Sequence, residues 1–102
     1  MGASKLPPEV IRVIEARDGA WTDKADTART LLGIDWPDVI QVARTAQTWK
    51  RTRDRQHQAI DGYVDAVEGR DRAGHLLYMA GKRVYYRGEV RWYVITIHDA
   101  DE

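Results

Sequence analysis

Basic and aromatic residues gather in two stretches of the sequence, and both residue types could act on a nucleic acid. The stretch TWKRTRDRQHQ, residues 48–58, holds five basic residues, His included, and a single acid. The later stretch GKRVYYRGEVRWYVITIH, residues 81–98, mixes Lys and Arg with Tyr and Trp and ends on His98. Cationic side chains bind phosphate oxygens, and aromatic rings stack on bases. Together the two stretches predict a surface for a polyanion such as RNA.

One reaction suits such a set of residues: cleavage of RNA by attack of its own 2′-hydroxyl on the adjacent phosphate. The nucleophile lies in the substrate, so the protein orients it, moves two protons and stabilises the phosphorane charge with cations. His98 could act as acid or base, because an unperturbed His has a pKa of about 6.5. The sequence has no nucleophile elbow, Gly-rich phosphate loop or dinucleotide fingerprint. We therefore expect chemistry without a metal or cofactor.

The charge of the chain is unevenly distributed. Its sixteen acidic and sixteen basic residues cancel, yet residues 44–98 hold eleven Lys or Arg and six Asp or Glu, a net charge of +5. Phosphate binding depends on a local patch, so this half remains a candidate surface, although charged runs are also common on ordinary solvated faces. The chain has no cysteine and no apolar run of about 18 residues, so we expect a cytoplasmic protein without disulfides or a membrane partner.

Helical signals dominate the first half of the chain. Pro7 and Pro8 indicate a helix over about 8–18, and Thr22 as N-cap with Gly33 as stop indicates a second. Asp35, with Asp38 three residues later, indicates a capping box that starts a third helix. The basic run 48–58 resembles an exposed helix end or loop. Ile60, Tyr63, Val64 and Val67 favour another helix, with a strand as the alternative, so the helical part is expected to cover about 8–67.

Strand signals follow, and they predict a β-meander over about 75–98 with an acidic tail at 99–102. HLLYM, RVYYR and RWYVITIH are rich in β-branched and aromatic residues, and AGK and the region around Gly88 are expected turns. Alternation along the last strand places Tyr93, Ile95 and Ile97 in the core, with Arg91 on the same face. We predict one α+β domain, residues 1–102, with N-terminal helices packed on a small C-terminal antiparallel β-sheet.

The order of these parts resembles the RelE/ParE superfamily of bacterial toxins, most of all the motility-quorum-sensing-regulator toxins and their uncharacterised relatives. Trp49-Lys50 matches an aromatic-Lys pair in that family, where the Lys is functional. Gly81, Val84 and Tyr85 match a Gly-x-Val-Tyr strand, where the Tyr is functional. A family glutamine has Gln56 and Gln58 as its candidates here, and the stretch between Lys50 and Gly81 is longer than usual.

The resemblance implies a RelE-like fold and a type II toxin that acts as a metal-independent messenger-RNA endoribonuclease. It also implies a cognate antitoxin, and it leaves open whether the ribosome is a further partner. Family members often use Lys, Arg and Tyr in place of a His acid or base. The catalytic set that we predict is Lys50, Tyr85, Arg87 and His98. The predicted RNA contacts are Trp49, Arg51, Arg53, Arg55, Lys82, Arg83, Tyr86 and Arg91.

Two other classes of function stay open at this point. A ParE-like toxin would bind a topoisomerase through the helical half without cleaving RNA. A non-catalytic antitoxin or immunity-type protein would use the sheet for protein contacts, and the zero net charge suits this option. Incubation with RNA separates the first interpretation from both alternatives.

Overall fold

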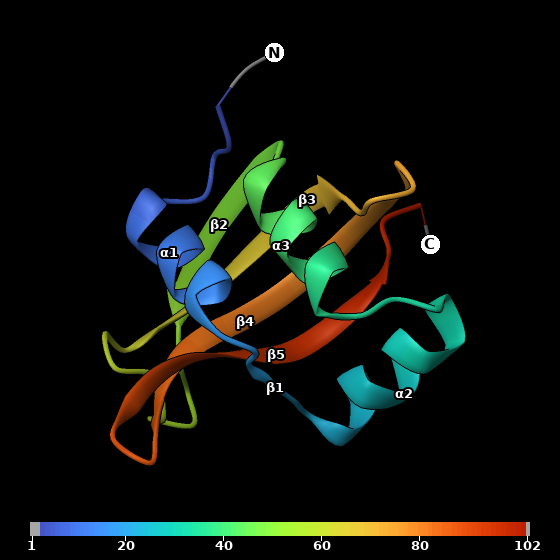
Figure 1. Ribbon diagram of the computed structural model, residues 1–102. Coiled ribbons are helices and arrows are strands. Elements are labelled where there is room, and N and C mark those ends of the chain that lie inside the picture. Colours follow the sequence, from blue (N-terminus) through green and yellow to red (C-terminus); the bar gives the residue numbers. More distant parts are fainter. Residues whose placement is uncertain (1–2, 102) are drawn as a thin grey trace.

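Two layers make up the fold: three helices lie on one side of a five-stranded sheet (Figure 1). This computed structural model describes residues 3–101. The predicted α+β class is confirmed, and the chain runs through helices before most of the sheet. In chain order the elements are α1 (Pro8–Ala16), β1 (Ala20–Trp21), α2 (Asp23–Leu32), α3 (Trp36–Arg44), β2 (Thr48–Arg53), β3 (Tyr63–Arg70), β4 (Leu76–Tyr86) and β5 (Glu89–Asp99).

The helix boundaries follow the capping signals. The Thr22 side chain accepts a hydrogen bond from the Ala25 backbone N–H, 3.1 Å away, and α2 ends at Gly33, whose φ of 70° is left-handed. Asp35 and Asp38 form the predicted capping box of α3. The first helix is shorter than predicted, because α1 ends at Ala16 rather than near residue 18.

The strand order is β1-β5-β4-β3-β2, and the sheet is mixed rather than antiparallel throughout. The short strand β1 pairs parallel with β5, so that Ala20 lies opposite Tyr93 and Trp21 opposite Val94. The other three pairings are antiparallel. The prediction of a purely antiparallel sheet is wrong because a two-residue strand between helices leaves little periodicity to detect.

The predicted helical part, residues 8–67, is wrong beyond Arg44. Residues 48–53 form the edge strand β2, whose side chains are mostly exposed, so no apolar alternation marks it. Residues 63–70 form β3, in which Asp65, Val67 and Gly69 alternate on the buried face. The helical spacing of apolar residues from 60 to 67 is coincidental, and Gly62 interrupts it with a φ of 84°.

Strand β4 runs without a break through the predicted AGK turn, because a bulge rather than a turn lies opposite it. Ala80 pairs with Thr96 and Gly81 with Val94, so Ile95 is the extra residue on β5. The bulge reverses the alternation of side chains before and after it. Trp92, Val94 and Ile97 therefore face the helices and are buried, and the predicted core positions of Tyr93, Ile95 and Arg91 are wrong.

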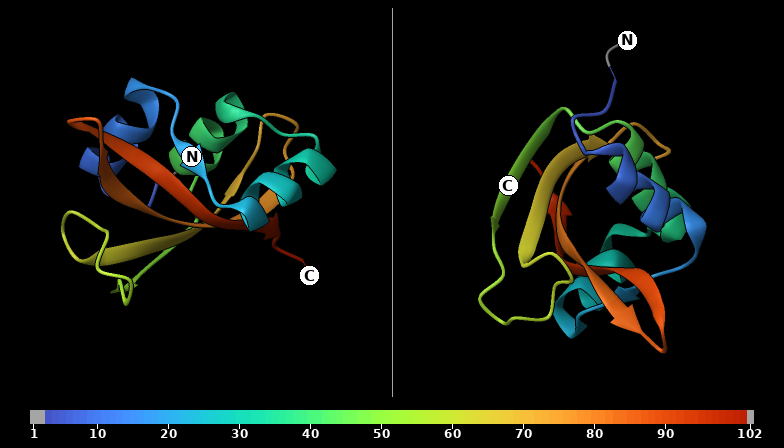
Figure 2. Two further views of the ribbon diagram at one scale, coloured as in Figure 1. Left: turned by 90° about the horizontal axis from the view of Figure 1, so that it is seen from below. Right: turned by 90° about the vertical axis from the view of Figure 1, so that its left-hand side faces the viewer.

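The core lies between the helices and this face of the sheet. Val10 and Ile14 of α1 and Val39 of α3 pack, fully buried, among the residues of one apolar cluster that includes Met79 and Val94. Of the helices within residues 3–101, none is both long and apolar enough to cross a membrane. Within residues 3–101, no helix lies on the opposite face of the sheet, as the two views in Figure 2 show.

Candidate functional site

The β4–β5 turn and the loop of residues 54–62, between β2 and β3, lie at the same end of the sheet (Figure 2). The Ile60 backbone N–H donates to the Arg83 carbonyl at 2.9 Å, which attaches the loop to β4 beyond the end of β3. The β4–β5 turn takes left-handed dihedrals at Arg87 and Gly88, with φ values of 52° and 80°. This end of the sheet therefore brings both basic stretches of the sequence together.

A pocket of about 460 Å³ opens between these segments, a volume within the range of small-ligand sites. Aromatic rings provide most of its walls, and Arg91 and Gln58 provide its polar groups. Tyr85 and Tyr86 at the end of β4 are 68% and 51% exposed. The lining residues are Ala20, Gln58, Val84, Tyr85, Tyr86, Arg91 and Tyr93. Stacking surfaces beside a cation are the combination that binds unpaired bases.

Two guanidinium groups lie near the ring of Tyr86. The Arg87 and Arg91 Cζ atoms are 5.4 and 5.6 Å from its centroid, within the range of cation–π attraction. Arg91 is also held in place, because it donates to the Asp18 carbonyl at 2.8 Å and to the Glu89 carboxylate at 3.0 Å. Arg91 is therefore a fixed cation in the pocket wall, whereas Arg87 extends from the exposed turn.

Asp54 organises the loop from a buried position. Its carboxylate accepts hydrogen bonds from the backbone N–H groups of Gln56, Gln58 and Ala59 at 3.1, 2.8 and 2.7 Å. Lys82 Nζ donates to both carboxylate oxygens at 3.2 Å. Burial would raise the pKa of Asp54, but these hydrogen bonds outweigh it and lower the pKa to about 2.

Lys82 is not a surface contact for RNA, and this prediction is wrong. Its side chain lies on the helix-free face of the sheet yet is 0% exposed, because the loop covers it. Its ammonium group donates hydrogen bonds to the Asp54 carboxylate and, at 3.2 Å, to the Gln56 side-chain oxygen. The ammonium lies 6.0 Å from the ring centroid of Tyr93, a lining residue of the pocket. Lys82 therefore contacts both the loop, through Asp54, and a wall of the pocket, through Tyr93.

The other predicted basic contacts divide into paired and unpaired groups. Arg51 donates to Asp65 at 2.8 Å, which raises the pKa of Arg51, and Arg83 donates to Asp61 at 2.6 Å. Trp49 also donates to Asp65, from its indole N–H at 2.9 Å. Within residues 3–101, no acidic group lies within 4 Å of the cationic atoms of Lys50, Arg53, Arg55 or Arg87. These four cations are free to meet phosphates.

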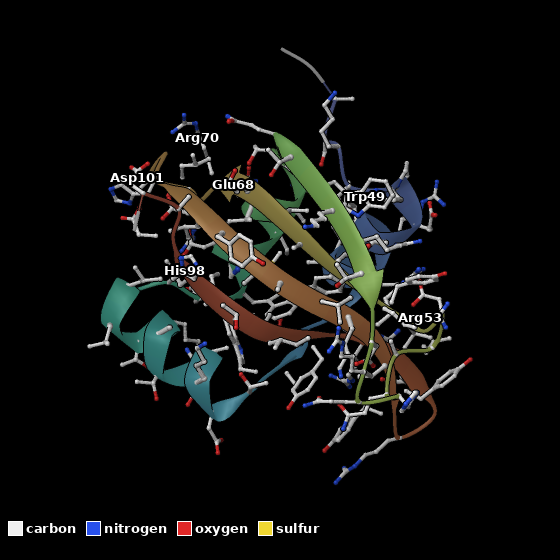
Figure 3. All side chains as sticks on the ribbon, turned by 180° about the vertical axis from the view of Figure 1, so that it is seen from behind. Trp49, Arg53, Glu68, Arg70, His98 and Asp101 are labelled. Atoms are coloured by element: carbon white, nitrogen blue, oxygen red, sulfur yellow. The ribbon has the colours of Figure 1, made fainter. Side chains whose placement is uncertain are left out.

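The predicted catalytic residues do not meet at one point. His98 pairs with Tyr78 and stacks on its ring, with centroids 4.9 Å apart. Tyr85 lies seven residues further along β4 than Tyr78, which is roughly 23 Å at about 3.3 Å per residue. Lys50 is on β2, opposite Ala66 of β3. Figure 3 shows His98 on the opposite side of the view from Arg53, which marks the end of β2 beside the loop.

Sequence reasoning missed the roles of Tyr93 and Asp54 in this site. Simple alternation places Tyr93 in the core because it does not include the bulge two residues further on. The sequence holds one signal for Asp54: it is the single acid within a basic run, where a carboxylate can pair with the cations around it. Gln58 was one of two glutamines proposed to match the family, and it is the one that lines the pocket.

No family model matches the chain, and neither the curated proteins nor the solved structures contain a significant match. Within residues 3–101, no three His, Asp or Glu side chains lie close enough together to hold a metal ion. Proposals about function therefore depend on the geometry of the pocket and on the residues around it.

Proposed function

We propose that the chain is a toxin of the RelE/ParE kind that binds single-stranded RNA and cleaves it without a metal. The observation that carries this proposal is the pocket of Tyr85, Tyr86 and Tyr93 with Arg91 in its wall. Single-stranded nucleic acids bind where aromatic rings stack on bases while cations follow the backbone. The chain combines both features at one end of its sheet.

The unpaired cations suit the backbone of such a strand. Arg53 lies at the end of β2, Arg55 in the adjoining loop, and Arg87 in the β4–β5 turn. All three are exposed and flank the segments that form the pocket. Lys50, further along β2, extends the same charge along the edge of the sheet. A bound strand would have its base in the pocket and its phosphates on these side chains.

Cleavage would use the 2′-hydroxyl of the RNA as nucleophile. The 2′-oxygen bonds to phosphorus, the bond to the 5′-oxygen breaks, and a 2′,3′-cyclic phosphate and a 5′-hydroxyl result. The 2′-hydroxyl loses one proton and the departing 5′-oxygen gains one, and we assign Tyr85 a part in this exchange. Arg87 and Arg91 would stabilise the phosphorane charge. Lys50 and His98 lie too far from Tyr85 to act on the same phosphate, so we assign them no step in it.

The test combines RNA cleavage with growth. Purified protein is incubated with a 5′-labelled single-stranded RNA in the presence of a metal chelator, and products are analysed for 2′,3′-cyclic phosphate ends. The same variants are induced in a bacterial host, and growth and RNA integrity are scored. Tyr85→Phe and Arg87→Ala should each reduce cleavage at least about 100-fold. Tyr78→Phe, on the same strand at its other end, is the matched control and should keep wild-type activity.

Each outcome separates the classes of function. Cleavage and growth arrest that depend on Tyr85 and Arg87 support the proposal. Growth arrest with intact RNA points to a ParE-like target such as a topoisomerase. Normal growth together with neutralisation of a second toxin identifies an antitoxin or immunity-type partner. Either of these last two results overturns the proposal.

A further inference from the structure

Gln58 is the one uncharged polar side chain among the residues that line the described pocket, apart from the tyrosine hydroxyls. Within residues 3–101 its amide makes no side-chain hydrogen bond, and the residue is exposed. A glutamine amide offers a donor and an acceptor side by side, which is the pattern that a base edge presents in return. Its chemistry therefore differs from that of the rings and cations around it.

The backbone of Gln58 is held firmly, although its side chain is free. Its N–H donates to Asp54 at 2.8 Å, and the next N–H, of Ala59, donates to the same oxygen at 2.7 Å. Lys82 fixes Asp54 from below, and the Ile60 N–H bonds to β4 two residues after Gln58. These four contacts together fix the backbone from which the Gln58 side chain extends.

Tyr93 links this anchor to the opposite wall. Its ring lies 6.0 Å from the ammonium of Lys82, and it lines the pocket together with Gln58. A planar base stacked on a tyrosine ring exposes its hydrogen-bonding edge at right angles to the stacking direction. Because Gln58 and Arg91 line the same pocket as Tyr93, the amide would meet that edge while Arg91 would meet the adjoining phosphate.

We propose that Gln58 is a specificity-determining residue that reads the edge of one unstacked nucleobase in the tyrosine pocket, and that Asp54 and Lys82 are positioning residues that aim it. This inference rests on the proposed function, because it names the part of the RNA that the pocket selects. It assigns base discrimination to the loop and leaves phosphate binding to the arginines.

The experiment measures the affinities of nine-nucleotide oligo(A), oligo(C) and oligo(U) RNA by fluorescence anisotropy at fixed salt. Each RNA carries 2′-O-methyl groups, which remove the nucleophile, so that the wild type cannot cleave it during the measurement. The readout is the ratio between the best and the worst Kd. We expect a ratio of about tenfold in the wild type and about twofold in Gln58→Ala. Gln58→Asn keeps the amide but shortens the side chain by one methylene. Because the backbone of residue 58 is fixed, the shorter side chain cannot reach the base, and the Kd ratio should fall as in Gln58→Ala. Gln47→Ala, at an exposed glutamine immediately before β2, is the control and should keep the wild-type ratio.

Asp54→Asn tests the positioning role, with the ratio as a readout that a general loss of stability does not change. Asp54→Asn should lower the Kd ratio as Gln58→Ala does. If Asp54→Asn does not fold, the Kd ratio of Gln58→Asn tests instead whether the position of the amide matters. Wild-type preference retained in Gln58→Ala and Gln58→Asn overturns this inference alone. A wild type that binds none of the three RNAs overturns the proposed function as well. Equal affinity of the wild type for all three removes base reading but leaves RNA binding in place.

Discussion

Lys82 and Asp54 form a buried ion pair, in which the lysine Nζ lies 3.2 Å from each carboxylate oxygen. Asp54 is 3% exposed and Lys82 is 0% exposed. The two residues come from the two basic stretches that the sequence offers as one RNA-binding surface. This buried pair therefore connects the two stretches. The unpaired arginines Arg53, Arg55 and Arg87 belong to the same two stretches.

Removal of Lys82 should therefore affect stability. Lys82→Met leaves the Asp54 carboxylate buried without its cation, and the loss of one partner of a buried pair costs about 3–5 kcal/mol. Arg87→Ala, at an exposed turn, should change the free energy of unfolding by less than about 0.5 kcal/mol. Urea unfolding of both variants measures the difference. Equal stabilities would mean that the buried pair does not hold the loop.

Asp54 should make stability depend on acidity in a defined window. Its folded pKa of about 2 is below the ordinary value of 3.8, so its contribution is complete above about pH 4 and is lost as the pH falls towards 2. The difference corresponds to roughly 2 kcal/mol, at 1.36 kcal/mol per pKa unit. The stability gap between wild type and Asp54→Asn, measured by urea unfolding from pH 6 to pH 2, should shrink by about this amount. A gap that stays constant across the window would contradict the assignment.

Gly81 should not tolerate a side chain. A Cβ atom built there would clash with the Trp92 indole, which packs flat against the glycine across the β4–β5 pairing. Gly81→Ala should cost about 1–3 kcal/mol through overpacking. The same change in a Trp92→Leu background should cost less, because the smaller side chain leaves room. A double-mutant cycle with no coupling energy would show that the close contact is unimportant.

The bulge at Ile95 predicts which residues of β5 carry the core. Trp92 is 1% exposed, whereas Ile95 is only half-buried. Trp92→Ala should cost about 3–5 kcal/mol through the cavity that it leaves, and Ile95→Ala clearly less. Thermal and urea unfolding of the two variants rank them. The reverse order would support the uninterrupted alternation that the sequence suggests.

Arg53 and Arg51 should behave differently although they are two residues apart on β2. Under the proposed function, Arg53→Ala weakens RNA binding and lowers the slope of log K against log salt by about 0.7, without loss of stability. Arg51→Ala breaks the bonds to Asp65, which is 1% exposed, and should destabilise the fold. Salt titrations of RNA affinity and urea unfolding make the comparison. An unchanged salt slope in Arg53→Ala would remove that residue from the RNA contacts.

Local signals in the sequence were sufficient for the helices. Thr22, Gly33 and the Asp35–Asp38 capping box define boundaries through contacts within a few residues, so they could be recognised without the fold. Strand β2 could not be recognised, because an exposed edge strand needs no apolar alternation and its charged residues resemble a loop. Its pairing with β3 is what makes it a strand.

The site was predictable in its residue types but not in its arrangement. Tyr85, Tyr86 and Arg91, which come from one stretch of the sequence, line one pocket. Lys82 was indistinguishable in the sequence from its exposed neighbours, because its burial depends on Asp54, which lies 28 positions away. His98 and Tyr85 both belong to the C-terminal stretch, but Tyr85 pairs with Val90 beside the turn and His98 pairs with Tyr78 at the far end of the β4–β5 hairpin.

The parallel pairing of β1 with β5 has a consequence for how the chain acquires its structure. Residues 20–21 meet residues 93–94, so contacts of very long sequence separation join the first part of the chain to the last strand. Helix α2 packs mainly on β5, and α1 lies between α3 and β5, so neither helix is fully covered until that strand is in place. Topologies of this kind have high contact order and fold slowly. A nascent chain therefore exposes its apolar helix faces until β5 emerges, which makes assembly of this domain a single late event during synthesis.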